Sequence, residues 1–193
     1  MQMETPAERL RSLLPQVFAP QPKEGELFVK LQVVPQVIVS IPLVSIAEVS
    51  LVMASEITPI PNMPDSVLGL FNTKGYVFWL IDLAYFLGFS STLSRVKSYE
   101  MVMVRAIPKQ HSDDATPTTN SSEQLIGLAV HHIQGSFRMP ASDIQTSDAG
   151  MKSRITSELL AYVDAYILNT QKPLPILNIE KMKTRLIELG QAT

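Results

Sequence analysis

Short runs of alternating apolar and polar residues fill most of the chain, and a period of two is typical of half-buried β-strands. Runs at residues 27–34 and 37–41 predict two strands joined by a short turn at Pro35. Residues 42–53 favour a helical turn that leads, near Glu48, into a strand. The three prolines within residues 57–64 predict an extended loop, because proline has no backbone N–H to donate.

The most apolar and most sharply interrupted stretch is VLGLFNTKGYVFWLIDL, at residues 67–83. It predicts a strand over 67–71, a tight turn over 72–75, and a second strand over 76–81 that ends at Asp82. Gly75 suits the turn because glycine accepts the positive φ that other residues resist. The cation at the tip of this predicted hairpin is Lys74.

The second half of the chain continues the β pattern after a helical turn that Gly88 closes. Further segments are expected as strands at residues 99–107, 125–133, 135–140 and 173–177, and in the second half of 159–168. Gly135 is expected to mark a bend, and residues 142–154 are expected to form a loop.

The last predicted element is an amphipathic helix that Asn178 caps. Its apolar stripe consists of Ile179, Met182, Leu186 and Leu189, and Gly190 is expected to end it. About nine or ten short strands with few helices predict a mainly β fold of barrel or sandwich type.

The domain organisation follows from where the apolar pattern stops. Residues 1–25 are interrupted by prolines and predict a partly disordered N-terminal extension, with a docking peptide as the alternative. Residues 26–190 form the predicted domain. The polar segment 108–123 is expected to be a mobile loop inside it, because it has too little apolar surface to order itself.

Composition narrows the possible functions. The chain has 193 residues, 46% of them hydrophobic, a net charge of -2 and no cysteine. This charge does not favour binding to nucleic-acid phosphates, and the absence of thiols excludes disulfides and thiolate metal sites. With neither a signal-peptide pattern nor 18 successive apolar residues, we expect a cytoplasmic protein that does not insert into a membrane.

Candidate catalytic residues are few. His131 and His132 are adjacent, and neighbours in a strand point to opposite faces, so we expect one buried and one exposed histidine rather than a shared metal. His111 with Asp113 and Asp114 fits either a weak metal site or a solvated loop.

Asp82 lies in the most apolar surroundings of any carboxylate, which allows a raised pKa and acid–base chemistry, but its place before LAYFLG favours a helix cap. The familiar motifs of nucleophilic, phosphate-binding and zinc-dependent enzymes do not occur. We predict no catalytic residue, no cofactor and no dedicated metal site, and therefore a binding module.

The hairpin resembles the signature of the CheW-like family of chemotaxis adaptor domains, whose members commonly carry G-x-x-N-x-[RK]-G-x-x-x-P-x-x-D-[LI]. Here the motif stands as GLFNTKG at 69–75, followed by YVFWLIDL at 76–83. IPLVSIAEV, LIGLAVHHIQGSFRMP and PLPILNIEKM extend the likeness over residues 26–189. Trp79 replaces the usual proline, and Lys74 replaces the commoner arginine.

This resemblance implies two intertwined five-stranded SH3-like barrels with a C-terminal helix and no catalytic activity. It implies an adaptor between the cytoplasmic tip of a methyl-accepting receptor and the regulatory domain of a CheA-type histidine kinase, at membrane receptor arrays. The residues that correspond to the family's partner-binding site are Ile46, Glu48, Val49, Asn72, Lys74 and Gly75. The sequence as a whole looks most like the sequences of adaptors from phototaxis or twitching-pilus systems.

Two alternatives remain at this point. A small β-barrel hydrolase would need Asp82 in an open pocket within hydrogen-bond reach of a base. An oligonucleotide-binding β-barrel would need exposed aromatic side chains beside lysine and arginine on one sheet face.

Overall fold

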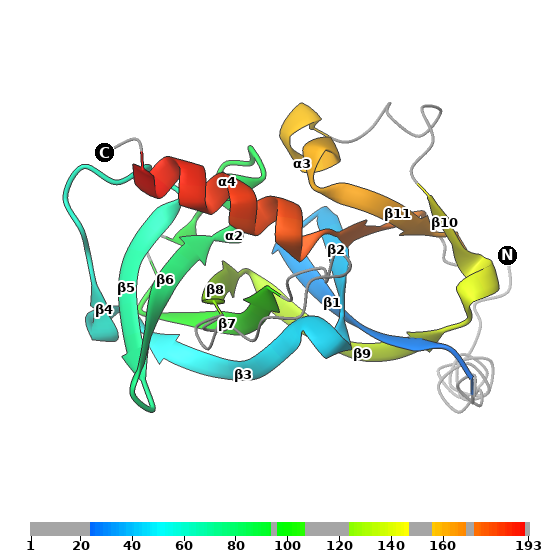
Figure 1. Ribbon diagram of the computed structural model, residues 1–193, viewed down its shortest axis with the longest axis horizontal. Coiled ribbons are helices and arrows are strands. Elements are labelled where there is room, and N and C mark those ends of the chain that lie inside the picture. The colour runs from blue at the N-terminus through cyan, green and yellow to red at the C-terminus, as the bar shows by residue number, and fades with distance from the viewer. Residues whose placement is uncertain (1–23, 94–95, 107–123, 147–155, 169–171, 192–193) are drawn as a thin grey trace, which may run out of the picture.

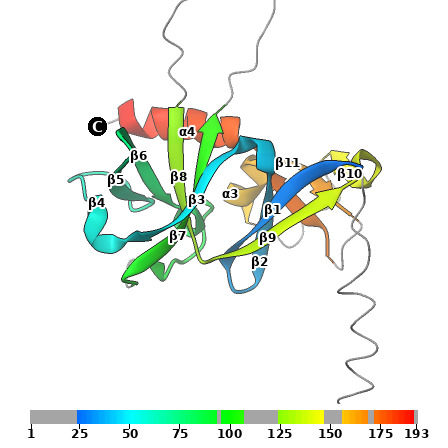
Figure 2. The same cartoon turned by 90° about the horizontal axis from the view of Figure 1, so that it is seen from below.

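In the computed structural model, residues 24–93, 96–106, 124–146, 156–168 and 172–191 are described (Figure 1). Two β-sheets lie side by side, and the C-terminal helix starts near their junction and extends over one of them (Figures 1 and 2). The predicted N-terminal extension, except for its last two residues, and the predicted loop over 108–123 lie outside the described residues, as do His111, Asp113 and Asp114.

The first sheet, here called the terminal sheet, contains strands from both ends of the domain. Its order is β10-β11-β12-β2-β1-β9. The strands are β1 (Glu26–Val34), β2 (Val37–Pro42), β9 (His132–Met139), β10 (Ile144–Thr146), β11 (Val163–Ile167) and β12 (Leu174–Leu177). Their neighbours pair antiparallel, except for the short parallel contact between β12 and β2.

The second sheet, here called the central sheet, contains only strands from the middle of the chain. Its order is β3-β7-β8-β6-β5-β4. The strands are β3 (Ile46–Met53), β4 (Ile57–Thr58), β5 (Val67–Thr73), β6 (Tyr76–Asp82), β7 (Ser98–Ala106) and β8 (Gln124–Val130). The chain therefore starts in the terminal sheet, builds the central sheet and returns, which interlocks the two units.

The helices of the described residues are short apart from the last one. They are α2 (Leu83–Phe86), α3 (Ser157–Ala161) and α4 (Ile179–Gln191), with 3₁₀ turns η1 (Leu43–Ser45), η2 (Ala54–Glu56) and η4 (Ala141–Asp143). Within the described residues, none of these helices combines the length and the apolar character that crossing a membrane requires.

Three apolar cores hold the fold together. The largest lies between the sheets and includes Ile41 from the terminal sheet, Val102 from the central sheet and Met182 from α4. The other two lie on the opposite faces, around Met101 in the central sheet and Phe28 in the terminal sheet. Because successive residues of a strand face opposite sides of the sheet, a strand in the middle of either sheet contributes side chains to two cores.

The mainly β prediction with a C-terminal helix is confirmed, and each sheet has one strand more than the expected five. The additional members are short. β4 occupies two residues of the proline-rich stretch that was expected to be only loop, and β10 occupies three residues of the segment 142–154. Both were missed because two or three residues are too few to show a periodic pattern.

Two predicted boundaries are wrong. The bend between β8 and β9 lies at His131, and Gly135 (φ 93°) instead accommodates an irregularity in the pairing of β9 with β1. Helix α4 continues through Gly190 to Gln191, because glycine weakens a helix without necessarily ending it. Ile179 and Met182 are buried as predicted and Leu186 packs against the inter-sheet core, whereas the Leu189 side chain is not among those described.

Candidate protein-binding site

The turn between β5 and β6 directs a lysine away from the sheet. Pairing extends to Thr73 and Tyr76, so the loop is only Lys74 and Gly75, rather than the four residues expected. Both residues have positive φ, 50° and 82°, which suits a two-residue hairpin because it follows the twist of the strands. Asn72 and Gly75 are exposed beside Lys74, and a Cβ at Gly75 would meet open space.

Lys74 makes an ion pair with a residue from a distant part of the sequence. Its Nζ lies 2.8 Å from Oε2 of Glu48 on β3. The two side chains are 68% and 30% exposed, so the pair lies at the surface. The structure thus brings together the two charged residues of the predicted site.

The apolar part of the predicted site lies on β3, the end strand of the central sheet. Val49 is 50% exposed, whereas Ile46 is half-buried and packs against the inter-sheet core. Leu51 and Met53 follow Val49 on the same outward face, at 66% and 46% exposure. The sequence shows their alternation, but it does not show that the sheet ends at β3 and leaves them uncovered.

Cross-strand pairing explains the position of Trp79. Pairing places Ile46, Val104, Ile126, Trp79 and Leu70 in one row across the central sheet. Residues paired in register share a face, so Trp79 lies on the same side as the inter-sheet core. It is 36% exposed because it stands at the margin of that face, beyond the buried Ile126.

Comparison with known proteins decides the family. The model of the CheW-like domain matches residues 31–185, which is most of the chain. The chain belongs to the CheW-like domain family. A comparison with curated proteins found no match.

Among solved structures, 15 chains match this CheW-like domain. One is the scaffolding protein TtCheW from Thermoanaerobacter tengcongensis, at a TM-score of 0.60 and 18% identity. The match covers 80% of this chain and 90% of TtCheW. At this identity the likeness establishes a shared fold, and it covers nearly the whole of the other protein.

In this CheW-like domain, Asp82 is the cap of α2. Its side chain is 2% exposed, and its Oδ1 accepts a hydrogen bond from the backbone N of Tyr85 at 3.1 Å. A hollow of about 310 Å³ between the β1–β2 turn and residues 90–93 includes His131 but not Asp82. The described residues therefore do not show the accessible Asp82 beside a base that a hydrolase needs.

Both adjacent histidines are exposed, so the expectation of one buried histidine is wrong. The strand alternation fails here because His131 is the bend between β8 and β9, and only His132 belongs to a strand. Nδ1 of His132 lies 2.8 Å from Oε1 of Glu100. Across the described part of the chain, no three histidine or carboxylate residues are grouped so that they could hold a metal ion.

The described surface also gives little support to oligonucleotide binding. Tyr76 and Trp79 are exposed on β6, but the neighbouring Lys74 is already paired with Glu48. A cation that a carboxylate neutralises contributes less to phosphate binding than a free one.

Proposed function

We propose that this CheW-like chain is a non-enzymatic adaptor that links the cytoplasmic tip of a methyl-accepting receptor to the regulatory domain of a CheA-type histidine kinase. Membership of the family supports the proposal. So does the likeness in fold to a scaffolding protein. We further propose a cytoplasmic location with recruitment to receptor arrays, and a role in phototaxis or twitching motility that rests on sequence likeness alone.

The observation that carries the proposal is the surface formed by β3 and the hairpin tip. It contains the exposed Val49 and, next to it along β3, Glu48, whose side chain pairs with Lys74. An apolar contact with oriented charges at its rim is typical of a protein–protein hot spot, where burial supplies affinity and charges orient the partner. Binding a partner through such a surface requires no catalytic group.

The lysine affects which partners this surface can select. The Lys74 ammonium is a compact charge that contacts Oε2 of Glu48. An arginine at this position would offer a planar pair of donors to a carboxylate. We infer that the surface recognises partner acids through a less directional contact than the arginine of most family members provides.

The test is binding of the purified chain to a CheA-type regulatory domain and, separately, to a receptor tip, measured by biolayer interferometry. We expect Val49→Asp to weaken binding to at least one partner by tenfold or more, about 1.4 kcal/mol. Lys74→Ala should cost less than about fivefold, since exposed single charges contribute little.

The matched control is Gln145→Asp, which places the same charge at an exposed position on β10, the outer strand of the terminal sheet. It should bind both partners as the unchanged chain does. If Val49→Asp and Lys74→Glu, shown to be folded by circular dichroism, retain full affinity for both partners, the site assignment is wrong.

A further inference from the structure

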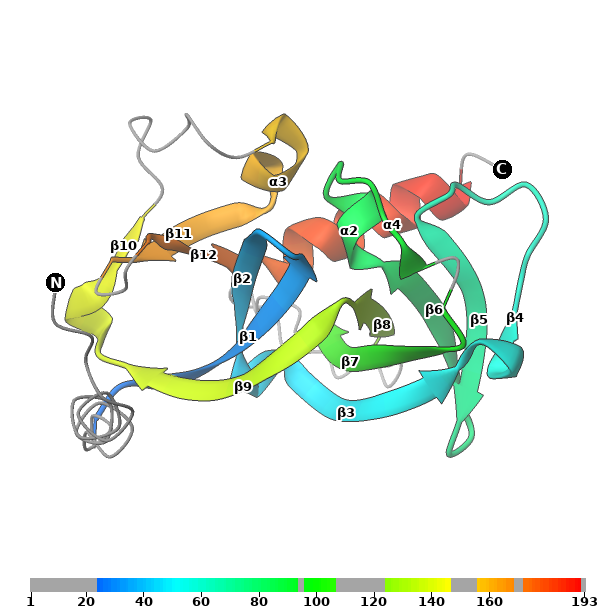
Figure 3. The same cartoon turned by 180° about the vertical axis from the view of Figure 1, so that it is seen from behind.

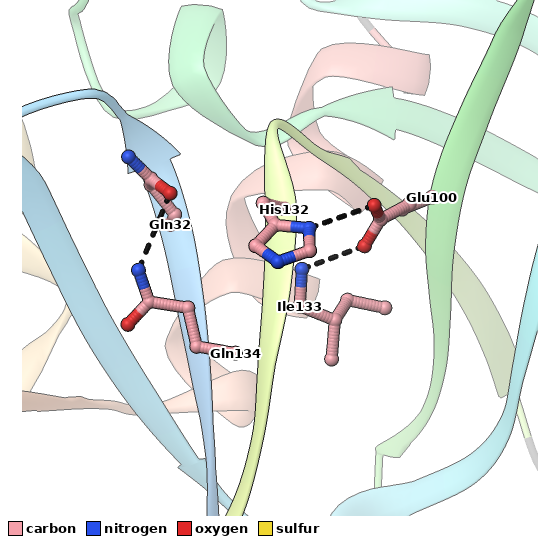
Figure 4. A network of polar contacts seen from close by, with 5 residues as sticks. All are labelled: Gln32, Glu100, His132, Ile133 and Gln134. Atoms are coloured by element: carbon pink, nitrogen blue, oxygen red, sulfur yellow. Dashed lines mark hydrogen bonds and ion pairs between the residues drawn. The ribbon is translucent and has the colours of Figure 1, made fainter. Parts of the chain in front are cut away.

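The carboxylate of Glu100 joins the two sheets. Glu100 lies on β7 of the central sheet, and both of its oxygens contact β9 of the terminal sheet (Figure 4). Oε1 lies 2.8 Å from Nδ1 of His132, and Oε2 accepts a hydrogen bond from the backbone N of Ile133 at 2.7 Å. The two contacts together fix β9 against β7.

These contacts occur where the chain passes from one sheet to the other. Only His131 separates the end of β8 from the start of β9, and its backbone N donates to the carbonyl of Gln32 on β1 at 3.1 Å. Gln134 Nε2 donates to Oε1 of Gln32 at 3.2 Å, which holds the same part of β9 to β1 (Figure 4). Figure 3 shows β9 leaving β8 and continuing along the terminal sheet.

We propose that Glu100, His132 and the amide of Ile133 form a joint that fixes the two sheets relative to each other. We call these three groups the sheet joint. Its role differs from ordinary packing because it acts at the one-residue crossing, where a small rotation of β9 would move the terminal sheet as a body.

The chemistry of the joint depends on the Glu100 carboxylate. A carboxylate accepts on both of its oxygens, so it can hold the imidazole of His132 and the amide of Ile133 at the same time. Hydrogen bonds to an ionised acceptor are stronger than bonds between neutral groups. The His132 and Glu100 side chains are 55% and 34% exposed, so this contact lies at the surface.

The groups around the ring come from three strands. Glu100 on β7 supplies the charged contact, Gln32 on β1 is the register partner of His132, and Gln134 follows on β9. Glu100 is therefore the group whose removal should loosen the joint most.

The joint reaches both the inter-sheet core and the proposed binding surface. Ile133 packs against the core between the sheets, so displacement of β9 would withdraw it. Glu100 is opposite Leu51 of β3, the strand that carries Val49. If the proposed adaptor function holds, the joint sets the orientation of the terminal sheet relative to the partner-binding strand, but the joint itself does not require that function.

Nuclear magnetic resonance of the ¹⁵N-labelled full chain tests the joint without any partner. In the unchanged chain at pH 8, the ¹⁵N shifts should show the Nδ1–H form of His132. The amide of Ile133 should exchange slowly after correction for intrinsic rates. Residual dipolar couplings report the angle between the sheets.

Three variants separate the joint from general stability. His132→Gln should reduce Ile133 protection, because it removes the imidazole that Glu100 contacts. His131→Gln, which removes the adjacent exposed histidine, should preserve it. Glu100→Ala should reduce Ile133 protection at least tenfold and change the dipolar couplings between sheets. Glu100→Gln, which retains one acceptor, should have an intermediate effect and replaces Glu100→Ala if that variant does not fold.

The proposal is overturned if the Glu100 variant that folds leaves both Ile133 protection and the inter-sheet couplings unchanged. It is also overturned if His131→Gln lowers Ile133 protection as much as His132→Gln does. Because no partner is present, failure of the adaptor proposal would not alter either result.

Discussion

A double-mutant cycle on Glu48 and Lys74 separates what their ion pair does for stability from what it does for binding. The cycle compares the unchanged chain with Lys74→Ala, Glu48→Ala and the double variant. Each single change removes the 2.8 Å contact between Nζ and Oε2. The coupling free energy is then the part of the effect that only the pair explains.

The exposure of the two side chains sets the magnitude. At 68% and 30% exposure, water screens the pair on at least one side. Two unit charges about 4 Å apart gain about 1 kcal/mol in bulk water, and holding two long side chains in place offsets part of this. We therefore expect a coupling of about 0.5 kcal/mol, which should largely disappear in about 1 M salt, where the screening length is about 3 Å.

Urea unfolding followed by circular dichroism measures the cycle at low and high salt. Each variant should keep the slope of the transition, because the area exposed on unfolding does not change. A coupling above about 2 kcal/mol that salt does not reduce would contradict the reasoning. It would mean that the pair supports the fold, so that losses of binding in Lys74 variants could not be assigned to the contact surface.

Three further predictions concern the fold around the hairpin. Asp82→Ala should lower the free energy of unfolding, measured in urea, by about 1–2 kcal/mol, because the N–H of Tyr85 loses its acceptor. Asp82→Asn should recover most of this loss, and equal losses in both variants would contradict the capping role of Asp82. Gly69→Ala should lower the free energy of unfolding by over about 2 kcal/mol in the same assay, since at φ 143° the added Cβ would lie 2.4 Å from the carbonyl oxygen of Thr58. An unchanged free energy would be evidence against this close approach. Burial, with a smaller effect from Asp82, raises the pKa of Tyr99, so the folded chain should lose stability as pH rises above about 10, where the unfolded tyrosine ionises first. Tyr99→Phe should therefore shift the midpoint of alkaline unfolding to higher pH, and no shift would show that Tyr99 does not contribute to this transition.

The sequence predicted the local elements well where pattern and turn chemistry agree. The hairpin, the helical turn after Asp82 and the cap of α4 at Asn178 all have a local cause in their own residues. The backbone N of Lys181 donates to Asn178 Oδ1 at 2.9 Å, as a capping side chain should accept. Such contacts span only three or four residues, so they can be inferred from the sequence without knowledge of the fold.

Long-range features could not be predicted in this way. The sequence does not show that β3 is an end strand, that Trp79 stands at the margin of a buried face, or that Glu100 crosses to β9. Each depends on which strands are neighbours in the sheet. His131 illustrates the same limit, because its exposure follows from the passage between sheets and not from the alternation of its own segment.

Only part of the candidate site could be predicted from the sequence. Resemblance to the family selected Glu48 and Lys74, and the structure brings them into contact. The exposure of Val49 agrees with that choice, whereas Leu51 and Met53 extend the same apolar surface and were not selected. The alternation of Val49, Leu51 and Met53 was the signal that the sequence offered for this surface. The same alternation occurs in strands whose outer face is covered.

The adaptor proposal is tested most directly by asking whether the chain bridges its two partners. Membranes that carry a methyl-accepting receptor are sedimented with a CheA-type histidine kinase, with and without the full chain, and the kinase in the pellet is measured. We expect the kinase to sediment only when the chain is present. Val49→Asp should reduce the pelleted kinase about tenfold, and Gln145→Asp should not. Equal sedimentation of the kinase without the chain, or none with it although both partners are folded, would contradict the adaptor function.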